Sequence, residues 1–392
     1  MENGTSLVKR RRKNMNFEKI TAYLNSVTEE YGIPSVDCMI MRDHKQLYRY
    51  MTGTVDTEHT VPVSAENQYL VFSMTKLQTM TAVMQLVEQG RLSLDDEVAK
   101  YLPAYGKLTV EEKADGKSTV VPAKRPMLIR HLVSMQSGLD YDLNRPGIVR
   151  VLKEYGDKAT TRRIVDAFVE TPLKFHPGEH FMYSLSHDVV AAIIEVVSGR
   201  SFGEYLQEYV WKPLGMKRTH FFKRSVPEPK LAQQYICGEK GIVPMENDCN
   251  YQLSGAYESG GAGLVSCTED YALLADMLAC GGTGMTGARV LKPETVDIIK
   301  TDLLSEQGHR DIVTTMGRQG YGYGCGMQIL MQPELVGSPA PAGVFGWDGA
   351  AGSCTIMEKD SRTALVFVMH VRNCGISYST IHPRLRDLLF EE

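Results

Sequence analysis

The 392-residue sequence lacks any apolar run approaching the roughly 20 residues needed to span a bilayer, which excludes an integral membrane helix. Its 35 glycines show no three-residue period, so it is not a collagen. The 43% apolar and 23% charged residues are the proportions of a folded protein and exclude a long disordered chain. We therefore expect a globular protein with room for two structural lobes.

Paired cysteines and an export signal are missing as well. The eight cysteines stand singly, and none forms a C-x-x-C pair. The basic cluster in residues 1–14 is followed at Met15 by Asn16 and Phe17 instead of by an apolar stretch, unlike a signal peptide. We therefore expect free thiols, a cytoplasmic location and a disordered basic tail over 1–14, followed by a catalytic domain over 15–392.

Excess positive charge is absent from the body of the chain. The formal net charge of the whole chain is −4. Residues 1–14 hold five basic residues and one acid and so carry a charge of +4, which means that residues 15–392 carry −8. An acidic body argues against a nucleic-acid-binding face. We therefore predict a small-molecule substrate, with no nucleic-acid or membrane partner, and the oligomeric state is left open.

Hydrophobic periodicity places strands at both ends of the chain and helices in the middle. We expect a helix from Phe17 to Tyr31 and strands over 36–41, 47–51, 323–330, 354–357 and 363–370. We also expect helices from Ser73, over 186–198, 268–278 and 385–390, a hairpin within 107–126, and an irregular stretch over 221–258. This order predicts an α/β lobe built from about 15–72 and 259–392, with a helical lobe over about 73–258 inserted into it.

Ser73-Met74-Thr75-Lys76 is the strongest candidate for chemistry. A serine hydroxyl needs a base to become a nucleophile, and three residues along a helix place Lys76 on the same face as Ser73. Apolar surroundings would lower the lysine pKa, and the helix N-terminus favours a developing oxyanion. The S-x-x-K pattern alone is short, since Ser6-Leu7-Val8-Lys9 also matches it, and an isolated match is equally compatible with a helix cap.

Other segments around this motif carry a family resemblance. They are FSMTK (72–76), LSLDDEVAKYLP (92–103), IRHLVSMQSGL (129–139), FHPGEHFMYSLSH (175–187), EVVSGRSFGEYL (195–206), KPLGMKRTHF (212–221), GGAGLVSCTEDYA (260–272) and FGWDGAAGS (345–353). Together they resemble the class C β-lactamase-related branch of the serine β-lactamases and penicillin-binding proteins, which includes D-alanyl-D-alanine carboxypeptidases, D-aminopeptidases and family VIII carboxylesterases. The resemblance implies an antiparallel sheet flanked by helices, with an inserted, mostly helical lobe.

The family's Y-x-N motif falls on Tyr183-Ser184-Leu185. The resemblance makes Tyr183 the group that relays protons, and we expect a nearby lysine to depress its pKa and make it a base. Leu185 departs from the motif's asparagine, which helps to orient amide substrates in the family, and Ser186 is the candidate substitute. We assign both positions to substrate binding.

The family's K-T-G motif falls on Trp347-Asp348-Gly349. Carboxylesterases of this branch have Trp-Gly-Gly at this place, so Trp347 and Gly349 resemble the esterase form. Without the lysine, and with Asp348 repelling anions, we expect neutral or cationic substrates. The resemblance also implies an oxyanion hole formed by the N–H groups of Ser73 and Ala350.

Two other patterns are weighed and set aside. His176-Pro177-Gly178-Glu179-His180 matches H-x-x-E-H, but Pro177-Gly178 breaks the helix that a zinc site of this type needs. No G-x-S-x-G occurs, which argues against an α/β-hydrolase. We expect neither a metal nor a cofactor.

The sequence predicts a serine hydrolase that acts through an acyl-enzyme on neutral carboxylic esters. One alternative is a D-aminopeptidase or D-alanyl-D-alanine carboxypeptidase, in which Asp348 would hold a substrate ammonium, with β-lactamase activity weak or absent. A second alternative is a catalytically silent, ligand-binding member of the fold.

Overall fold

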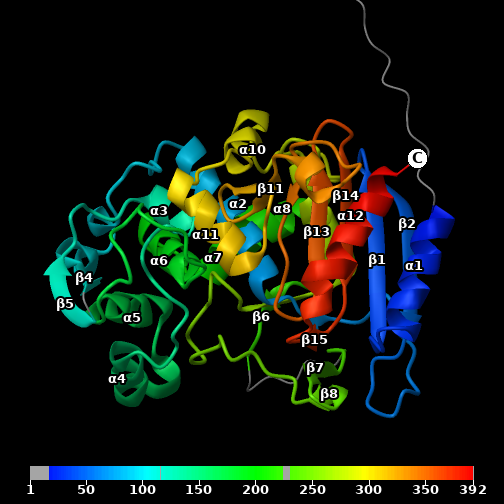
Figure 1. Cartoon of the computed structure of the whole chain (residues 1–392), viewed down its shortest axis with the longest axis horizontal. Helices are drawn as coiled ribbons and strands as arrows, with labels where there is room; N and C mark the ends of the chain where they lie inside the picture. The colour runs from blue at the N-terminus through cyan, green and yellow to red at the C-terminus, as the bar shows by residue number, and fades with distance from the viewer. Residues whose placement is uncertain (1–16, 115, 224–229, 392) are drawn as a thin grey trace, which may run out of the picture.

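The computed structural model describes residues 17–114, 116–223 and 230–391, so the predicted basic tail over 1–14 lies outside the described residues. A large antiparallel sheet lies at one side of the molecule, and many of the helices gather at the other side (Figure 1). The nucleophile candidate Ser73 stands in the 3₁₀ turn η1 (Phe72–Met74), directly before helix α2 (Thr75–Glu88).

The large sheet has seven strands in the order β10-β11-β12-β13-β14-β1-β2, and each neighbouring pair is antiparallel. Strands from both ends of the sequence therefore share one sheet. The bounds are β1 (Ser35–Arg42), β2 (Lys45–Gly53), β10 (Tyr321–Tyr323), β11 (Gln328–Leu330), β12 (Phe345–Gly346), β13 (Cys354–Glu358) and β14 (Thr363–Val368). All of β1 except its last residue is buried, because both faces of the sheet are covered.

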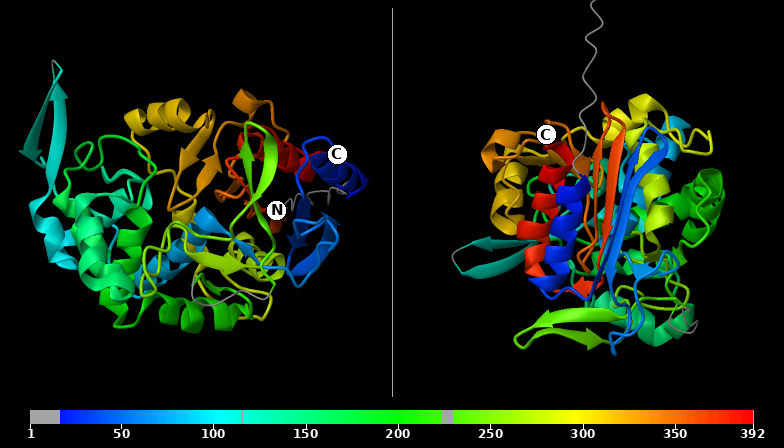
Figure 2. Two further views of the ribbon diagram at one scale, coloured as in Figure 1. Left: turned by 90° about the horizontal axis from the view of Figure 1, so that it is seen from below. Right: turned by 90° about the vertical axis from the view of Figure 1, so that its right-hand side faces the viewer.

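Helices cover the two faces of this sheet. α1 (Phe17–Glu29) and α12 (His382–Phe390) lie next to each other on one face, and α9 (Thr268–Ala279) packs on the other (Figure 2). The predicted helical period of α1 is confirmed, since its buried residues Ile20, Leu24 and Val27 recur at three- and four-residue spacing. In the described part of the chain, no helix combines the length and the apolar character required to traverse a bilayer.

The helices beside the sheet pack mainly around α2 and α6. Their bounds are α3 (Ile129–Val133), α4 (Pro146–Tyr155), α5 (Thr161–Asp166), α6 (Ser186–Ser198), α7 (Phe202–Leu206), α8 (Lys212–Leu214), α10 (Pro293–Ile299) and α11 (Glu306–Met316). The prediction of a buried helix over 186–198 matches α6, and α7 begins at the expected capping box of Ser201 and Glu204.

Three small sheets complete the fold. The first contains β3 (Tyr69–Leu70), β9 (Leu264–Ser266) and β6 (His220–Phe221). The second contains β15 (Val371–Arg372), β7 (Gln234–Gly238) and β8 (Gly241–Met245). The third is the hairpin of β4 (Thr109–Ala114) and β5 (Lys117–Pro122). The β4–β5 hairpin, predicted within 107–126, stands out from the body (Figure 2, left).

Two sequence-based expectations are wrong. The stretch 221–258, predicted to be irregular, contains the β7–β8 hairpin, which gains its partner from β15 far along the chain. The single strand predicted over 323–330 is a hairpin of β10 and β11, because Gly326 takes a positive φ of 69° that reverses the chain.

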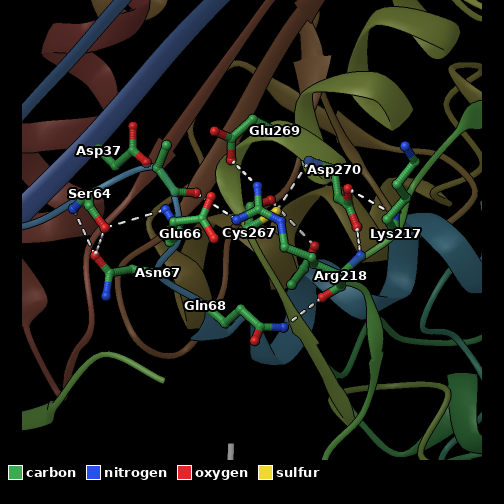
Figure 3. A network of polar contacts seen from close by, with 12 residues as sticks. Asp37, Ser64, Glu66, Asn67, Gln68, Lys217, Arg218, Cys267, Glu269 and Asp270 are labelled. Carbon is green, nitrogen blue, oxygen red and sulfur yellow. Dashed lines mark hydrogen bonds and ion pairs between the residues drawn. The ribbon is translucent and has the colours of Figure 1, made fainter. Parts of the chain in front are cut away.

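A charged network ties the sheet to the segment that carries the nucleophile (Figure 3). Arg49 on β2 binds the buried carboxylate of Asp37 on β1 at 2.7 Å and also contacts Glu269 on α9. Glu269 in turn accepts from Arg218 at 2.8 Å. The Arg218 carbonyl accepts from the Gln68 amide at 2.8 Å, and Gln68 directly precedes β3. The network thus links the sheet to the strand that leads to η1.

Candidate active site

Lys76 is fully buried on the first turn of α2 and lies against the nucleophile candidate. Its Nζ is 3.2 Å from Ser73 Oγ, 3.0 Å from the Tyr141 hydroxyl and 2.8 Å from the Gly261 carbonyl oxygen. Burial lowers the pKa of Lys76 to about 7, although the carboxylates of Asp188 and Asp348 oppose the shift.

A neutral Lys76 fits this set of contacts. As an ammonium, Nζ donates to all three oxygens; once it is neutral, its two N–H bonds can stay on the Gly261 carbonyl and the Tyr141 oxygen, and its lone pair can face the Ser73 hydroxyl. Ser73 itself is partly exposed, while its chain neighbours are buried. The arrangement therefore offers an accessible hydroxyl with a base behind it.

The residue before the nucleophile has an unusual backbone. Phe72 takes a φ of 45°, in the left-handed region that non-glycine residues seldom occupy. Its ring is buried and meets the Tyr251 ring edge-on, with centroids 6.2 Å apart. A conformation of this kind costs on the order of 1–3 kcal/mol and persists only where the surroundings hold it. The packing of the Phe72 ring thus helps to hold the turn that presents Ser73.

Tyr183 lies on the other side of the lysine. Its ring centroid is 4.6 Å from Lys76 Nζ, and its hydroxyl accepts a hydrogen bond from Trp347 Nε1 at 3.0 Å. A hydrogen bond with Ser73 lowers the Tyr183 pKa, but burial outweighs it and raises the pKa well above its ordinary value. The expectation of a depressed pKa is therefore wrong, because a desolvated phenolate is too costly here. Tyr183 is therefore a neutral hydroxyl that can donate and accept a hydrogen bond.

Trp347 and Gly349 shape the strand end beside Tyr183. The Trp347 ring is buried, with its centroid 5.5 Å from that of Tyr183 and 5.1 Å from that of Tyr323. A Cβ placed on Gly349 would lie 2.4 Å from the Val71 carbonyl oxygen. Only glycine therefore permits this close approach between the strand end and the segment before Ser73.

Asp348 is not the free acid that the sequence suggested. Its carboxylate binds the Arg318 guanidinium at 2.6 Å, and the residue is 8% exposed. His382 Nδ1 lies 3.9 Å from the Asp348 Oδ2 atom that Arg318 binds. The charge of Asp348 is therefore balanced within the fold, which weakens the expected repulsion of anions and the proposed role in holding a substrate ammonium.

Ala350 follows in a tight turn in which the Gly352 N–H donates to the Gly349 carbonyl at 2.9 Å. Across the ranges that the structure describes, neither the Ala350 N–H nor the Ser73 N–H donates to a backbone carbonyl outside a regular helix or strand. Both groups thus remain available to a ligand, and the oxyanion hole of Ser73 and Ala350 stays a prediction.

Leu185 and Ser186 turn inward. Leu185 is 2% exposed and packs in the core at the start of α6. The buried Ser186 hydroxyl bonds with Ser137 at 2.7 Å and with Ser184 at 2.8 Å. Both side chains are occupied within the protein, so their assignment to substrate binding stays a prediction without support from these contacts.

Sequence reasoning missed Tyr141. It follows the matched segment 129–139 closely, and its hydroxyl lies 3.0 Å from Lys76 Nζ. Its ring stacks on Tyr183, with centroids 5.5 Å apart. No motif marked it, although its place next to a family segment was the available signal.

Asp188 was missed as well. It is buried on α6, where its Oδ1 accepts from the hydroxyls of Tyr257 at 2.7 Å and Ser259 at 2.6 Å. The Asp188 charge raises the pKa of Lys76 against the effect of burial. A carboxylate directly before the apolar run 189–194 was the signal in the sequence, because such groups are rarely buried without a partner.

The histidines of the H-x-x-E-H pattern have separate partners. His176 Nε2 lies 2.9 Å from Glu112, and His180 Nδ1 lies 3.0 Å from Asp311.

A separate group of His44, Asp276 and Cys280 has its ligand-type atoms within 4.8 Å of one another. His44 Nδ1 contacts Asp276 at 2.7 Å, and the guanidinium of Arg362 lies 3.4 Å from His44 Nε2. Since the arginine can only donate, His44 Nε2 is the acceptor of this contact and Nδ1 is the atom that meets Asp276.

Comparisons with known proteins agree on one family. A family model described as beta-lactamase matches residues 16–373. Esterase EstB of Burkholderia gladioli is 25% identical over 402 residues, covering 95% of this chain and 94% of that protein. A putative D-alanyl-D-alanine carboxypeptidase of Escherichia coli K12 is 25% identical over 385 residues, covering 91% and 82%. The structure of EstCE1, a hydrolase with promiscuous acyltransferase activity, superposes with a TM-score of 0.77 at 24% identity, covering 96% of this chain and 98% of that one.

Proposed function

Because the chain belongs to the beta-lactamase family, we propose that it is a serine hydrolase that cleaves small carboxylic esters through an acyl-enzyme on Ser73. One observation carries the proposal: the fully buried Lys76, with a pKa of about 7, lies 3.2 Å from the Ser73 hydroxyl. A lysine with that pKa is about half neutral at pH 7, which suits a general base. The esterases among the similar proteins support the same reaction.

In the acylation step, Ser73 Oγ attacks the ester carbonyl carbon, and its proton moves to Lys76 Nζ. The carbonyl oxygen becomes an oxyanion that the N–H groups of Ser73 and Ala350 would stabilise. When the tetrahedral intermediate collapses, the C–O bond to the alcohol breaks. The departing oxygen takes a proton from the Tyr183 hydroxyl, and Lys76 returns to Tyr183, directly or through a water molecule, the proton that it took from Ser73.

In the deacylation step, a water molecule attacks the acyl carbonyl. Its proton passes to the Tyr183–Lys76 pair, the bond to Ser73 Oγ breaks, and Ser73 recovers a proton as the carboxylic acid leaves. The high pKa of Tyr183 makes it a relay of protons, with Lys76 as the group that stores the charge.

The altered motifs favour esters over amides. An alkoxide leaves more readily than an amine, so an ester needs less help in orientation than an amide does. The position of the family's asparagine holds Leu185, whose side chain packs in the core. The alternative D-aminopeptidase activity relied on a free Asp348, and the contact with Arg318 removes that basis. The similarity to a putative D-alanyl-D-alanine carboxypeptidase keeps that activity as the second candidate.

The cytoplasm is the compartment that we propose. None of the eight cysteines forms a disulfide within the described residues, and this holds for the half-buried Cys237 and Cys280 as well. Cysteines without disulfides are typical of a reducing compartment.

The test is hydrolysis of p-nitrophenyl acetate by the wild type and by Ser73→Ala. Ser6→Ala is the matched control, since Ser6-Leu7-Val8-Lys9 has the same pattern as Ser73 to Lys76. We expect Ser73→Ala to lose at least about 1,000-fold in kcat and Ser6→Ala to keep full activity. D-alanine p-nitroanilide, a D-alanyl-D-alanine peptide and a chromogenic cephalosporin, assayed in parallel, separate the alternatives. Faster turnover of either amide substrate than of the ester would transfer the assignment to a peptidase, and absence of any turnover would support a silent member of the fold.

A further inference from the structure

Arg372 is a cation at the edge of the site that no step above uses. It ends β15, and the N–H of the preceding Val371 donates to the Ala351 carbonyl at 3.0 Å. The Arg372 guanidinium lies over the Phe72 ring, 5.1 Å from its centroid. Phe72 directly precedes Ser73, and Ala351 directly follows Ala350. The strand that Arg372 ends and the side chain of this arginine therefore contact the two segments that carry the predicted oxyanion hole and the nucleophile.

The charge of Arg372 has no acidic partner in the described ranges of the chain, and its guanidinium donates no hydrogen bond there. The buried arginines Arg318 and Arg145 differ from Arg372, because they bind Asp348 at 2.6 Å and Asp140 at 2.7 Å. Arg372 is only partly exposed, so water does not fully replace the missing partner. The guanidinium makes a cation–π contact with the Phe72 ring, but this ring carries no negative charge.

The two acids inside the site are bonded to other groups of the fold. Asp348 binds Arg318 at 2.6 Å, and Asp188 accepts from two hydroxyl groups. Burial raises the pKa of Tyr251 and that of the Cys249 thiol, and the charge of Arg372 lowers both, while Asp248 acts on Cys249 in the opposite direction to Arg372. None of these acids forms an ion pair with Arg372 in the described residues, so its guanidinium can bind an anionic group that reaches this edge of the site.

We propose that Arg372 binds a carboxylate carried by the ester substrate, at a position remote from the scissile bond. The inference rests on the proposed esterase function and names its substrate class. A guanidinium supplies two parallel N–H donors that match a carboxylate, and a partly desolvated site strengthens the contact. The negative charge belongs to either the acyl chain or the alcohol, and the two arms of the experiment separate these sources.

The experiment compares matched esters that differ in one charge. Mono-p-nitrophenyl glutarate against p-nitrophenyl valerate tests the acyl side, and 4-acetoxybenzoate against 4-acetoxybenzamide tests the alcohol side. The readout is the ratio of kcat/KM for the anionic ester to that for the neutral one. We expect Arg372→Gln to lower this ratio at least about tenfold in one arm, chiefly through KM, since a hydrogen bond to a charged group is lost.

Two further variants complete the design. Arg372→Lys keeps a point charge but loses the two parallel donors, so it should retain a ratio between those of the wild type and Arg372→Gln, whereas added NaCl should lower the wild-type ratio. Arg162→Gln removes the same charge from α5, where the arginine is exposed and 3.9 Å from Asp166, and should leave the ratio unchanged. Circular dichroism and Tm identify any variant that does not fold. If Arg372→Gln does not fold, the ratio in Arg372→Lys and the effect of NaCl on the wild-type ratio test the inference instead.

The outcomes are distinct. If wild type hydrolyses both kinds of ester and Arg372→Gln leaves both ratios unchanged, Arg372 only covers Phe72 and the inference is wrong, while the esterase proposal stands. If wild type hydrolyses no ester, or if Ser73→Ala keeps full activity, the proposed function itself fails and the inference fails with it.

Discussion

Protonation of one buried amine should control the rate. Lys76 can accept the Ser73 proton only when it is neutral, and burial brings its pKa from 10.5 down to about 7. That difference corresponds to roughly 5 kcal/mol of penalty for placing a charged amine at this position. The neutral fraction of Lys76 is near one at pH 8 and falls about tenfold for each pH unit well below 7.

We therefore expect kcat/KM for p-nitrophenyl acetate to fall about 100-fold between pH 8 and pH 5, with a plateau above pH 8. The assay follows p-nitrophenol at its isosbestic wavelength, so that ionisation of the product does not distort the profile. Asp188→Asn should move the acid limb to lower pH, because the Asp188 charge raises the Lys76 pKa. A profile that keeps rising through pH 10 would mean that Lys76 has an ordinary pKa and would refute the reasoning.

The same pKa has a consequence for stability. Between pH 7 and pH 10.5 the unfolded chain holds a proton on Lys76 that the folded chain has released, so folding becomes more favourable as pH rises through this window. Between pH 7 and pH 10.5, the free energy of unfolding of the wild type should increase by up to about 5 kcal/mol more than that of Lys76→Met. Urea unfolding at pH 7 and pH 10 measures this difference, and equal pH dependence in the two proteins would contradict it.

Three other variants probe the arrangement. Tyr183→Phe should lose about 100- to 10,000-fold in kcat because it removes the relay hydroxyl, and it should lower Tm because the buried Trp347 Nε1 loses its acceptor at a cost of about 1–3 kcal/mol; steady-state kinetics with calorimetry check both. Gly349→Ala should lower both kcat and Tm, at a cost of about 1–3 kcal/mol, since its Cβ would lie 2.4 Å from the Val71 carbonyl oxygen. Arg49→Gln should cost about 3–5 kcal/mol in urea unfolding because it leaves Asp37 buried without its guanidinium, and a loss below 1 kcal/mol would contradict the account.

The sequence predicted the groups that are close together along the chain. Ser73 and Lys76 are three residues apart at a helix start, and a helix leaves little freedom in how they meet. Tyr183 was predicted through the family motif, and its place beside Lys76 agrees with that prediction. Local periodicity likewise predicted α1, α6 and the strands β1 and β2.

Groups that depend on distant partners were not predictable in this way. The charge of Asp348 looked like a feature of the substrate site until Arg318, thirty residues earlier, was seen to neutralise it. The Tyr183 pKa depends on burial, which a short motif does not contain. Arg372 lies on Phe72, which is 300 residues away in the sequence. Long-range contacts of this kind require the fold, whereas helix spacing does not.

The central claim is that Ser73 becomes acylated, and mass spectrometry of the intact protein tests it most directly. After rapid mixing with a p-nitrophenyl ester and quenching in acid, the wild type should gain the mass of one acyl group, and peptide mapping should place that group on Ser73. Ser73→Ala should gain none, and Ser6→Ala should match the wild type. An acyl group on another residue, or ester turnover that persists in Ser73→Ala without any adduct, would contradict the account.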